Sequence, residues 1–395
     1  MNALSALLNL PETEKTTRGL AHTPAEIAQQ PDSWLTTFEL FQKRRAEIRD
    51  FLLAAGLGST PGSKPAIFLV GAGTSDYIGQ SLVYLLRKVW ECDVIAVPST
   101  DLLTHFEELV RPRQKYLWIA FSRSGDSPEG VAVLENACRK RPDIHHLVIS
   151  CNANARMIRD SAGKPQVLSI CLDDAVNDRG LAMTSSFSNL VVFGQCLAHA
   201  DDPARYEQVL MQLVQSGKSF LPMAADCAAA LAKAPYTKAC FVGSGPLRAV
   251  ARESALKLLE LTAGKVLTMS ESALGLRHGP MAALDPDTLF VCFLSAGHRV
   301  QEYERDLIEE IGNKRLVRSQ VVVAGRAVSA MESLAKHYLA PATSFTVADD
   351  YRPPVDVIFG QLLGLFFSLR CNLRPDCPSP NGAISRVVQN VSIHS

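Results

Sequence analysis

The sequence predicts an α/β protein made of two related domains, each built on a parallel β-sheet flanked by helices. Short, continuous apolar runs alternate with helical stretches, a pattern typical of a parallel sheet buried on both faces. A glycine-containing segment also occurs twice, as Gly71-Ala72-Gly73 and Gly243-Ser244-Gly245, and the same shift of 172 residues places Leu117 on Leu289. A chain of 395 residues has room for about two domains of this kind.

Composition excludes several classes of protein. Lysine and arginine total 40, aspartate and glutamate total 40, and the formal net charge is zero. A neutral balance gives no electrostatic attraction to nucleic acid or to an anionic membrane. Aromatic residues make up 7% of the chain, which disfavours a base-stacking surface. We therefore expect neither nucleic acid nor membrane as a partner.

The cellular location is predicted from the chain start, the apolar runs and the thiols. The first residues lack a basic patch followed by an apolar stretch and a small-residue cleavage site. The longest apolar region, Ile358 to Leu369, contains Gln361 and is too short to span a bilayer. Ten cysteines form no C-x-x-C pair, which favours reduced, mostly buried thiols over a disulfide framework. These features predict a cytoplasmic protein.

The expected elements follow in chain order. Thr23-Pro24-Ala25-Glu26 is a helix-start signal, and Asp32 or Ser33 can cap a second helix. Gly56 to Pro65 is rich in breakers and precedes the first sheet. Five strands are predicted, at Ile67–Val70, Val94–Val97, Tyr116–Phe121, His146–Ser150 and Val167–Leu172. The expected divisions are a helical segment 1–58, a first domain 59–200, a helical linker 201–236, a second domain 237–372 and a tail 373–395.

A candidate phosphate site follows the strand Tyr116–Phe121. Its loop, Ser122-Arg123-Ser124-Gly125-Asp126-Ser127-Pro128, places three hydroxyls on a glycine-containing turn at a helix N-terminus, where backbone N–H groups attract anions. The alternative is a capped turn that binds nothing, which explains Ser127 well but explains Ser122 and Ser124 poorly. The second half has Leu294, Ala296 and His298 at the positions of Ser122, Ser124 and Asp126. We therefore expect one phosphate site per chain, in the first domain.

The turn at Gly71 is only half of a dinucleotide-binding fingerprint. Asp76 stands where the third glycine belongs, and no acidic residue follows the strand Val94–Val97. These two departures argue against a nicotinamide cofactor.

Candidate chemistry lies on the helix that follows the strand Ala239–Val242. Glu253, Lys257 and Glu260 fall at i, i+4 and i+7, hence on one helix face. The alternative is a solvated stripe of intrahelical ion pairs. His278 follows in Arg277-His278-Gly279-Pro280, and on residue type alone it could be an ordinary surface histidine.

Taken in order and spacing, these motifs resemble the sugar isomerase (SIS) family and are similar to the isomerase half of glucosamine-6-phosphate synthase. The stretches His22–Pro31 and Leu181–Phe187 resemble its tagatose-6-phosphate ketose/aldose isomerase branch, whose members act as galactosamine-6-phosphate deaminases. The resemblance covers nearly the whole chain. It implies two tandem SIS domains, each a parallel five-stranded sheet with a flavodoxin- or Rossmann-like fold.

The resemblance also assigns roles to individual positions. It implies that Glu260 moves a proton between C1 and C2, that His278 opens the sugar ring, in the synthase from a neighbouring subunit, and that Lys257 lies close to the substrate. It implies no metal or redox cofactor, and a homodimer or larger homo-oligomer with its active site at the subunit interface. The expected phosphate-binding residues are Ser75, Ser122, Arg123 through its backbone, Ser124 and Ser127, and a loop closing on the sugar carries Thr184 and Ser185.

The resulting expectation is deamination with isomerisation of galactosamine 6-phosphate to tagatose 6-phosphate and ammonia. The tail has Arg386 where the synthase has a reactive lysine, and arginine cannot form a Schiff base or act as a general base. No glutaminase domain is expected as an ammonia source, which favours ammonia release over synthesis. The alternatives are isomerisation of a neutral aldose or ketose phosphate, and a non-catalytic sugar-phosphate sensor.

Overall fold

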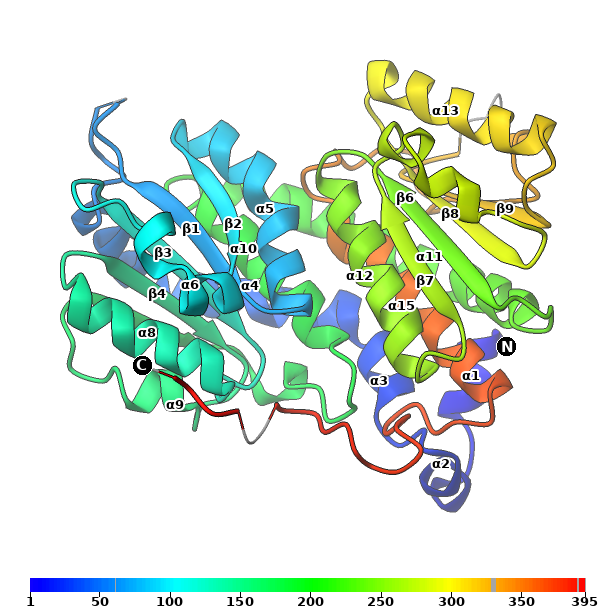
Figure 1. Ribbon diagram of the computed structural model, residues 1–395, viewed down its shortest axis with the longest axis horizontal. Coiled ribbons are helices and arrows are strands. Elements are labelled where there is room, and N and C mark those ends of the chain that lie inside the picture. The colour runs from blue at the N-terminus through cyan, green and yellow to red at the C-terminus, as the bar shows by residue number, and fades with distance from the viewer. Residues whose placement is uncertain (61, 328–331, 389–390, 395) are drawn as a thin grey trace. The chain divides into compact units, whose positions relative to one another are not determined.

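The computed structural model describes residues 1–60, 62–327, 332–388 and 391–394 and divides the chain into two compact units (Figure 1). The first-sheet unit comprises Ser33–Asn177, Ser185–Gln208 and Ser385–Ser395. The second-sheet unit comprises Met1–Asp32, Asp178–Thr184 and Val209–Ile384. The domain boundaries expected from sequence stay a prediction.

Each unit holds one parallel five-stranded sheet, which confirms the predicted fold class. The first sheet has the order β2-β1-β3-β4-β5 and the second the order β10-β9-β8-β6-β7. Numbered within its own unit, each sheet therefore has its second strand at one edge, then the first, third, fourth and fifth. The strands are β1 (Ala66–Gly71), β2 (Val94–Pro98), β3 (Tyr116–Ser122), β4 (His145–Ser150), β5 (Val167–Cys171), β6 (Lys238–Gly243), β7 (Leu267–Glu271), β8 (Thr288–Leu294), β9 (Ser319–Ala324) and β10 (His337–Leu339).

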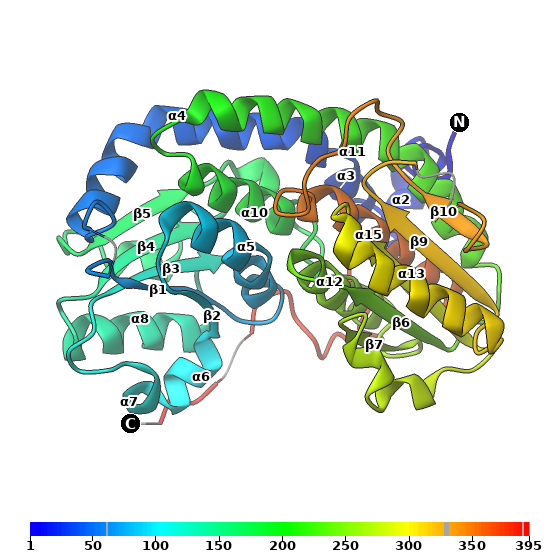
Figure 2. The same cartoon turned by 90° about the horizontal axis from the view of Figure 1, so that it is seen from above.

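Helices cover both faces of each sheet. On the first sheet, α5 and α10 lie on one face and α6, α7 and α8 on the other (Figure 2). On the second sheet, α12 packs closely against α15, and α13 covers the opposite face. Helices of the first-sheet unit are α5 (Thr74–Trp90), α6 (Ser99–Thr104), α7 (Phe106–Leu109), α8 (Pro128–Lys140), α9 (Arg156–Arg159) and α10 (Ser185–Ala198). Helices of the second-sheet unit are α1 (Ala3–Leu8), α2 (Glu12–Arg18), α3 (Thr23–Ala28), α12 (Pro246–Leu261), α13 (His298–Asn313) and α15 (Pro353–Arg370).

Two long helices, α4 (Gln30–Ala54) and α11 (Pro203–Leu231), contribute residues to both units. The predicted linker helix from Pro203 is thus present. The predicted helix starts near the N-terminus were wrong in detail. Thr23 already belongs to α3 and gives its hydroxyl to Asp376, 2.8 Å away, and α4 begins at Gln30, before the expected caps Asp32 and Ser33.

The two sheets use the same strand-to-helix turn. Gly73 has φ 56° and ψ −125°, and Gly245 has φ 56° and ψ −129°, a conformation that essentially only glycine adopts. At Gly71 and at Gly243 a side chain is also excluded, because a Cβ atom there would lie 2.3 Å from the backbone of the following helix. The sequence similarity around these glycines therefore has one physical cause, a helix that starts directly against the strand end.

Two features of the chain concern membrane spanning and disulfide bonding. No helix within the described ranges is both long and apolar enough to cross a bilayer. All ten cysteines are free thiols. Cys151, Cys196, Cys240 and Cys292 are buried, whereas Cys377 is exposed.

Candidate active site

The serine loop, residues 122–127, joins β3 to α8 in the first-sheet unit. It lies at the carboxyl end of the sheet between β1 and β3, where the strand order reverses and α/β folds bind ligands. Each of its three serine hydroxyls accepts a backbone N–H farther along the chain: Ser122 from Gly125 (2.9 Å), Ser124 from Asp126 (3.3 Å) and Ser127 from Gly130 (3.3 Å). Because each hydroxyl oxygen acts here as an acceptor, its hydrogen can still be donated. None of the three hydroxyls donates to another residue in the described part of the chain. Three hydroxyl donors in the loop before a helix are suited to an anion.

The serine loop is held rigidly by the connection between β4 and α9. Gly125 has φ 61°, and a Cβ atom there would lie 2.4 Å from the Cβ of Ala155. The side-chain amide of Asn152 donates to the carbonyl of Ser124 at 2.9 Å and to the carboxylate of Asp126 at 3.1 Å. The loop is thus preorganised, so that little ordering entropy would be lost when it binds a ligand.

Arg123 directs its side chain toward the C-terminal tail. The side chain is buried, and its guanidinium donates to the carbonyl of Arg386 at 2.5 Å. The guanidinium of Arg386 in turn donates to the carbonyl of Asn177 at 3.3 Å and to the side-chain oxygen of the same residue. The backbone role expected for Arg123 is compatible with this geometry, and Arg386 ties the tail to the first-sheet unit.

Ser75 lies in the first turn of α5, next to the serine loop's strand. Its backbone N–H donates to the carbonyl of Ala72 at 3.1 Å, and the residue is 7% exposed. Asp76, which sequence reasoning treated only as a departure from a dinucleotide motif, is equally buried and accepts from the amide of Gln80 at 2.7 Å.

Thr184 and Ser185, expected in a loop that closes on the sugar, are both fully buried. The backbone N–H and the hydroxyl of Thr184 donate to the two carboxylate oxygens of Asp178, at 2.8 and 3.0 Å. The Thr184 carbonyl accepts from the amide of Gln361 at 3.2 Å. These contacts fix the segment before α10, and sugar binding by Thr184 and Ser185 stays a prediction.

The candidate catalytic cluster lies on α12. Lys257 Nζ is 2.6 Å from Glu260 Oε2 and 3.4 Å from Glu253 Oε1, so the predicted common face is confirmed. The side chains of Glu253 and Lys257 are 0% and 1% exposed, whereas that of Glu260 is 31% exposed. The alternative of a solvated stripe is therefore wrong for the first two residues. One carboxylate is left at the surface, held by a buried ammonium.

Close packing explains why this face of α12 is buried. Helix α15 approaches through two glycines: a Cβ atom on Gly360 would lie 2.2 Å from the hydroxyl of Ser254, and one on Gly364 would lie 2.9 Å from the carbonyl of Lys257. The backbones of the two helices thus approach more closely than side chains would allow, which excludes water from around the Lys257 ammonium.

His278 is exposed between two short 3₁₀ turns, Gly275–Arg277 and Pro280–Ala283. Its backbone N–H donates to the carbonyl of Gly275 at 3.0 Å, and Gly279 follows with φ 119°. Its ring forms no hydrogen bond or ion pair with any described residue. The structure therefore brings Glu253, Lys257 and Glu260 together but leaves His278 separate from them.

Sequence reasoning missed a carboxylate cluster formed by Glu26, Asp178 and Asp376 in the second-sheet unit. The pKa of Glu26 is raised to about 7, first by burial and then by the negative charge of Asp178. The hydrogen bonds that Glu26 accepts from the backbone of Arg179 and Gly180 act in the opposite direction. The cluster joins the two stretches that carried the branch resemblance, 22–31 and 181–187. Nothing in the sequence marked Asp178 or Asp376, which lie far from Glu26 along the chain.

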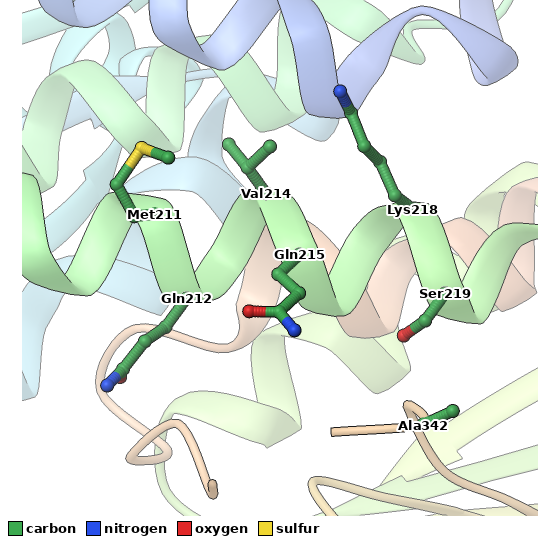
Figure 3. Close-up of a pocket in the computed structure, with 7 residues that line it drawn as sticks. All are labelled: Met211, Gln212, Val214, Gln215, Lys218, Ser219 and Ala342. Carbon is green, nitrogen blue, oxygen red and sulfur yellow. The ribbon is translucent and has the colours of Figure 1, made fainter. Parts of the chain in front are cut away.

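A separate pocket of about 550 Å³ lies beside α11 (Figure 3). Its lining consists of Met211, Gln212, Val214, Gln215, Lys218, Ser219 and Ala342. Lys218 is ion-paired with Asp32 at 2.6 Å, and none of the expected site residues contributes to this lining. The pocket is therefore not the candidate active site.

Comparison with known proteins places these features in context. No family model matches the chain. The AgaS protein of Streptomyces coelicolor is 36% identical over 95% of this chain and 95% of its own length. The D-galactosamine-6-phosphate deaminase AgaS of Escherichia coli is 31% identical, over 94% and 95% of the two chains. The crystal structure of tagatose-6-phosphate ketose/aldose isomerase from Escherichia coli superposes with a TM-score of 0.84 at 29% identity, covering 94% of this chain and 96% of that one.

Proposed function

Since the chain belongs to the AgaS family of D-galactosamine-6-phosphate deaminases, we propose that it converts galactosamine 6-phosphate and water into tagatose 6-phosphate and ammonia, in amino-sugar breakdown. The observation that carries this proposal is the α12 cluster, where Lys257 holds the accessible carboxylate of Glu260 at 2.6 Å. A sensor would need no such pair, whereas proton transfer between neighbouring carbons needs a fixed carboxylate.

Binding is assigned to the serine loop. The hydroxyls of Ser122, Ser124 and Ser127 have hydrogens to donate, and the first turn of α8 adds the positive end of its dipole. A dianionic sugar phosphate is the ligand best matched to this chemistry. Ser75 and the backbone of Arg123 are proposed to complete the site.

The proton chemistry is assigned to Glu260. Once the ring is open, this carboxylate removes the proton from C2, giving an enamine between C1 and C2. Returning the proton to C1 leaves an imine at C2, which water hydrolyses to the ketone with release of ammonia. Lys257 has a positioning role, because its ammonium is ion-paired with both Glu260 and Glu253 and its side chain is only 1% exposed.

Ring opening is assigned to His278, whose reference pKa of about 6.5 suits an acid and a base near neutral pH. The ring is exposed and bonded to no described residue, which suits a group that completes its site in an oligomer. We propose a homodimer or larger homo-oligomer in which His278 serves a neighbouring subunit. The free thiols suit a reducing cytoplasm, where we place the protein.

Ammonia release from galactosamine 6-phosphate, measured beside glucosamine 6-phosphate at equal concentration, tests the proposed function. We expect ammonia from the galacto sugar and a ketose phosphate in equal amount. Ammonia from neither sugar, in a protein that still binds both, would contradict the proposal. That result would favour isomerisation of a neutral sugar phosphate or a sensor, and conversion of tagatose 6-phosphate to its aldose would then distinguish the two.

Mixing two inactive homo-oligomers tests the role of His278. Oligomers of E260Q and of H278N are dissociated and reassociated together. If His278 serves a neighbouring subunit, some mixed interfaces regain both native groups and activity returns. If His278 serves its own chain, each hybrid site still lacks one group, and the mixture stays inactive.

A further inference from the structure

The second sheet has a loop in the position that the serine loop has in the first. Strands β6 and β8 adjoin each other as β1 and β3 do, and their pairing has the same register: Ala239 lies opposite Leu289 as Ile67 lies opposite Leu117. After β8 the loop continues through residues 295–297 into α13, as the serine loop continues into α8. Both loops therefore lie where a parallel sheet reverses its strand order, the usual ligand position of such folds.

Backbone donors of this second loop bind carboxylates of the same chain. The N–H of Ser295 donates to Glu304 Oε2 at 2.7 Å, and the N–H of Ala296 donates to both carboxylate oxygens of Asp349, at 2.9 and 3.2 Å. The hydroxyl of Ser295 also donates to Asp349. The Asp349 carboxylate thus receives two donors from this loop, the Ser295 hydroxyl and the Ala296 N–H, and lies where a phosphate oxygen would lie in an anion site.

A buried guanidinium completes the arrangement. Arg352 is 2% exposed and donates to the Leu294 carbonyl at 2.9 Å, to Asp349 at 2.9 Å and to Asp356 at 2.7 Å. Gly325, just beyond β9, makes room for it, because a Cβ atom there would lie 3.1 Å from the guanidinium. Backbone N–H groups, a hydroxyl and an arginine are the donor set that proteins use for phosphate.

We propose that the second half of the chain retains an anion-binding cradle, formed by Ser295, Ala296 and Arg352, and that Asp349 and Glu304 occupy it as internal carboxylate ligands. The cradle takes no phosphate while Asp349 is in place. Replacing Asp349 by alanine opens it to a tetrahedral dianion. The Asp349 side chain is 20% exposed, so the vacated position is accessible from solvent.

The buried carboxylate of Glu304 determines the pH at which anion binding is best tested. It is fully buried and faces the hydroxyl of Ser244, the backbone of Ser295, the carboxylate of Asp349 and the guanidinium of Arg352. Burial raises the pKa of Glu304 to about 7. Acidic pH favours the neutral form of Glu304, which repels an incoming anion less, whereas sulfate is still a dianion at pH 6.0. Sulfate at pH 6.0 is therefore the probe.

The experiment measures the unfolding temperature of the full chain against sulfate, with chloride at matched ionic strength subtracted. In D349A we expect the unfolding temperature to rise by about 2 °C more than in the parent at a sulfate concentration ten times the dissociation constant. D306A is the matched control, because Asp306 lies on the same α13 helix as Glu304 but is 58% exposed, and we expect no extra rise. The sulfate-dependent rise can be measured even if D349A unfolds at a lower temperature than the parent. D349S is a second variant that removes the carboxylate.

A crystal structure of D349A or D349S grown in sulfate is the direct measurement. Sulfate density against Ser295, Ala296 and Arg352 would support the proposal. No extra sulfate-dependent rise in either variant, or density that shows the cradle closed without an anion, would overturn it. Repeating the comparison in an S122A/S124A parent separates this inference from the proposed function. These two substitutions remove any sulfate-dependent rise in unfolding temperature caused by the serine loop. The extra rise caused by D349A should be unchanged.

Discussion

The two halves of this chain share a sheet order and a strand-to-helix turn, but they differ in which loop and which helix carry polar groups. The first half has hydroxyls in the loop after β3, whereas the second has internal carboxylates bound to the equivalent loop after β8. The helices show the reverse. Where α12 carries Glu253, Lys257 and Glu260, helix α5 carries Ser81, Leu85 and Lys88.

Under the proposed function, the two related halves therefore have different roles. Each half keeps the backbone geometry that places a loop and a helix start at the carboxyl end of its sheet, because glycine at Gly73 and Gly245 makes the turn possible in both. Side chains then decide what each half does. Anion binding is proposed for the first half and proton transfer for the second, so that neither half duplicates the other.

The largest expected effect is a loss of activity on substitution in α12 that the equivalent substitution in α5 does not cause. E260Q removes the ionised carboxylate and leaves its shape, so we expect ammonia release to fall about 10³-fold while sugar-phosphate binding is retained. K88Q changes the equivalent position on α5, which is exposed, and we expect activity within about twofold of the parent. Initial rates and ligand-binding isotherms of both variants give the comparison. E260Q with more than a tenth of parental activity would remove Glu260 from the base role.

The second effect is a pH dependence caused by the internal carboxylate of the second half. The pKa of Glu304 is raised from 4.5 to about 7 by burial, so the folded state favours the neutral form. The contribution of this group to stability is thus fully present below pH 4.5 and is lost as pH rises through 7. The loss is on the order of 3 kcal/mol. Urea denaturation at pH 5.0 and 7.5 measures it.

E304Q should lose this part of the pH dependence and keep the part caused by Glu26, whose pKa is also raised to about 7. E302Q, at an exposed position of the same helix, is the control and should follow the parent at both pH values. An E304Q slope equal to that of the parent would mean that Glu304 is ionised in the folded protein at neutral pH.

A third prediction compares equivalent glycines of the two loops. Gly125 has φ 61° and a Cβ atom would clash with Ala155 at 2.4 Å, whereas Gly297 has φ −75° and its nearest neighbour would lie 3.5 Å away. We expect G125A to destabilise the protein by about 2 kcal/mol. G297A should change stability by less than about 0.5 kcal/mol. Equal effects in thermal denaturation would show that the loops are alike in their backbone demands.

The smallest effect concerns single hydroxyls. S124A removes one donor to a charged ligand, worth about 1.5 kcal/mol, and we expect KM to rise roughly tenfold with little change in kcat. S295A changes a serine of the second loop, whose hydroxyl is engaged with Asp349, and should leave KM unchanged. Steady-state kinetics on galactosamine 6-phosphate distinguishes them. A rise in KM for S295A as large as that for S124A would contradict the assignment of binding to the first half alone.

Sequence patterns predicted the sheets well because their cause is local. Buried parallel strands need continuous apolar residues, and all five strands expected between Ile67 and Leu172 are present within a residue or two of their predicted ends. The face shared by Glu253, Lys257 and Glu260 was predictable for the same reason, since helical periodicity alone determines it.

The remaining features depend on contacts between distant residues. The sequence showed that the second loop has no hydroxyls at the positions equivalent to Ser122 and Ser124. It could not show which groups its backbone N–H donors bind. Their binding to Asp349, more than fifty residues farther along, could not be foreseen. Similarly, the start of α3 was misjudged because the Thr23 hydroxyl bonds to Asp376 rather than capping its own helix.

The glycines of α15 have a mechanical consequence for the chemistry. Gly360 has no room for even a methyl group, because its Cβ would lie 2.2 Å from the Ser254 hydroxyl, so the backbone of α15 packs directly against the Ser254 side chain of α12. Helix α12 carries Glu260 rigidly with it. A shift of a few tenths of an ångström at this crossing would therefore move the Glu260 carboxylate by a similar amount. The position of the proposed catalytic carboxylate therefore depends on packing against α15, a helix that contributes none of the residues assigned to the reaction.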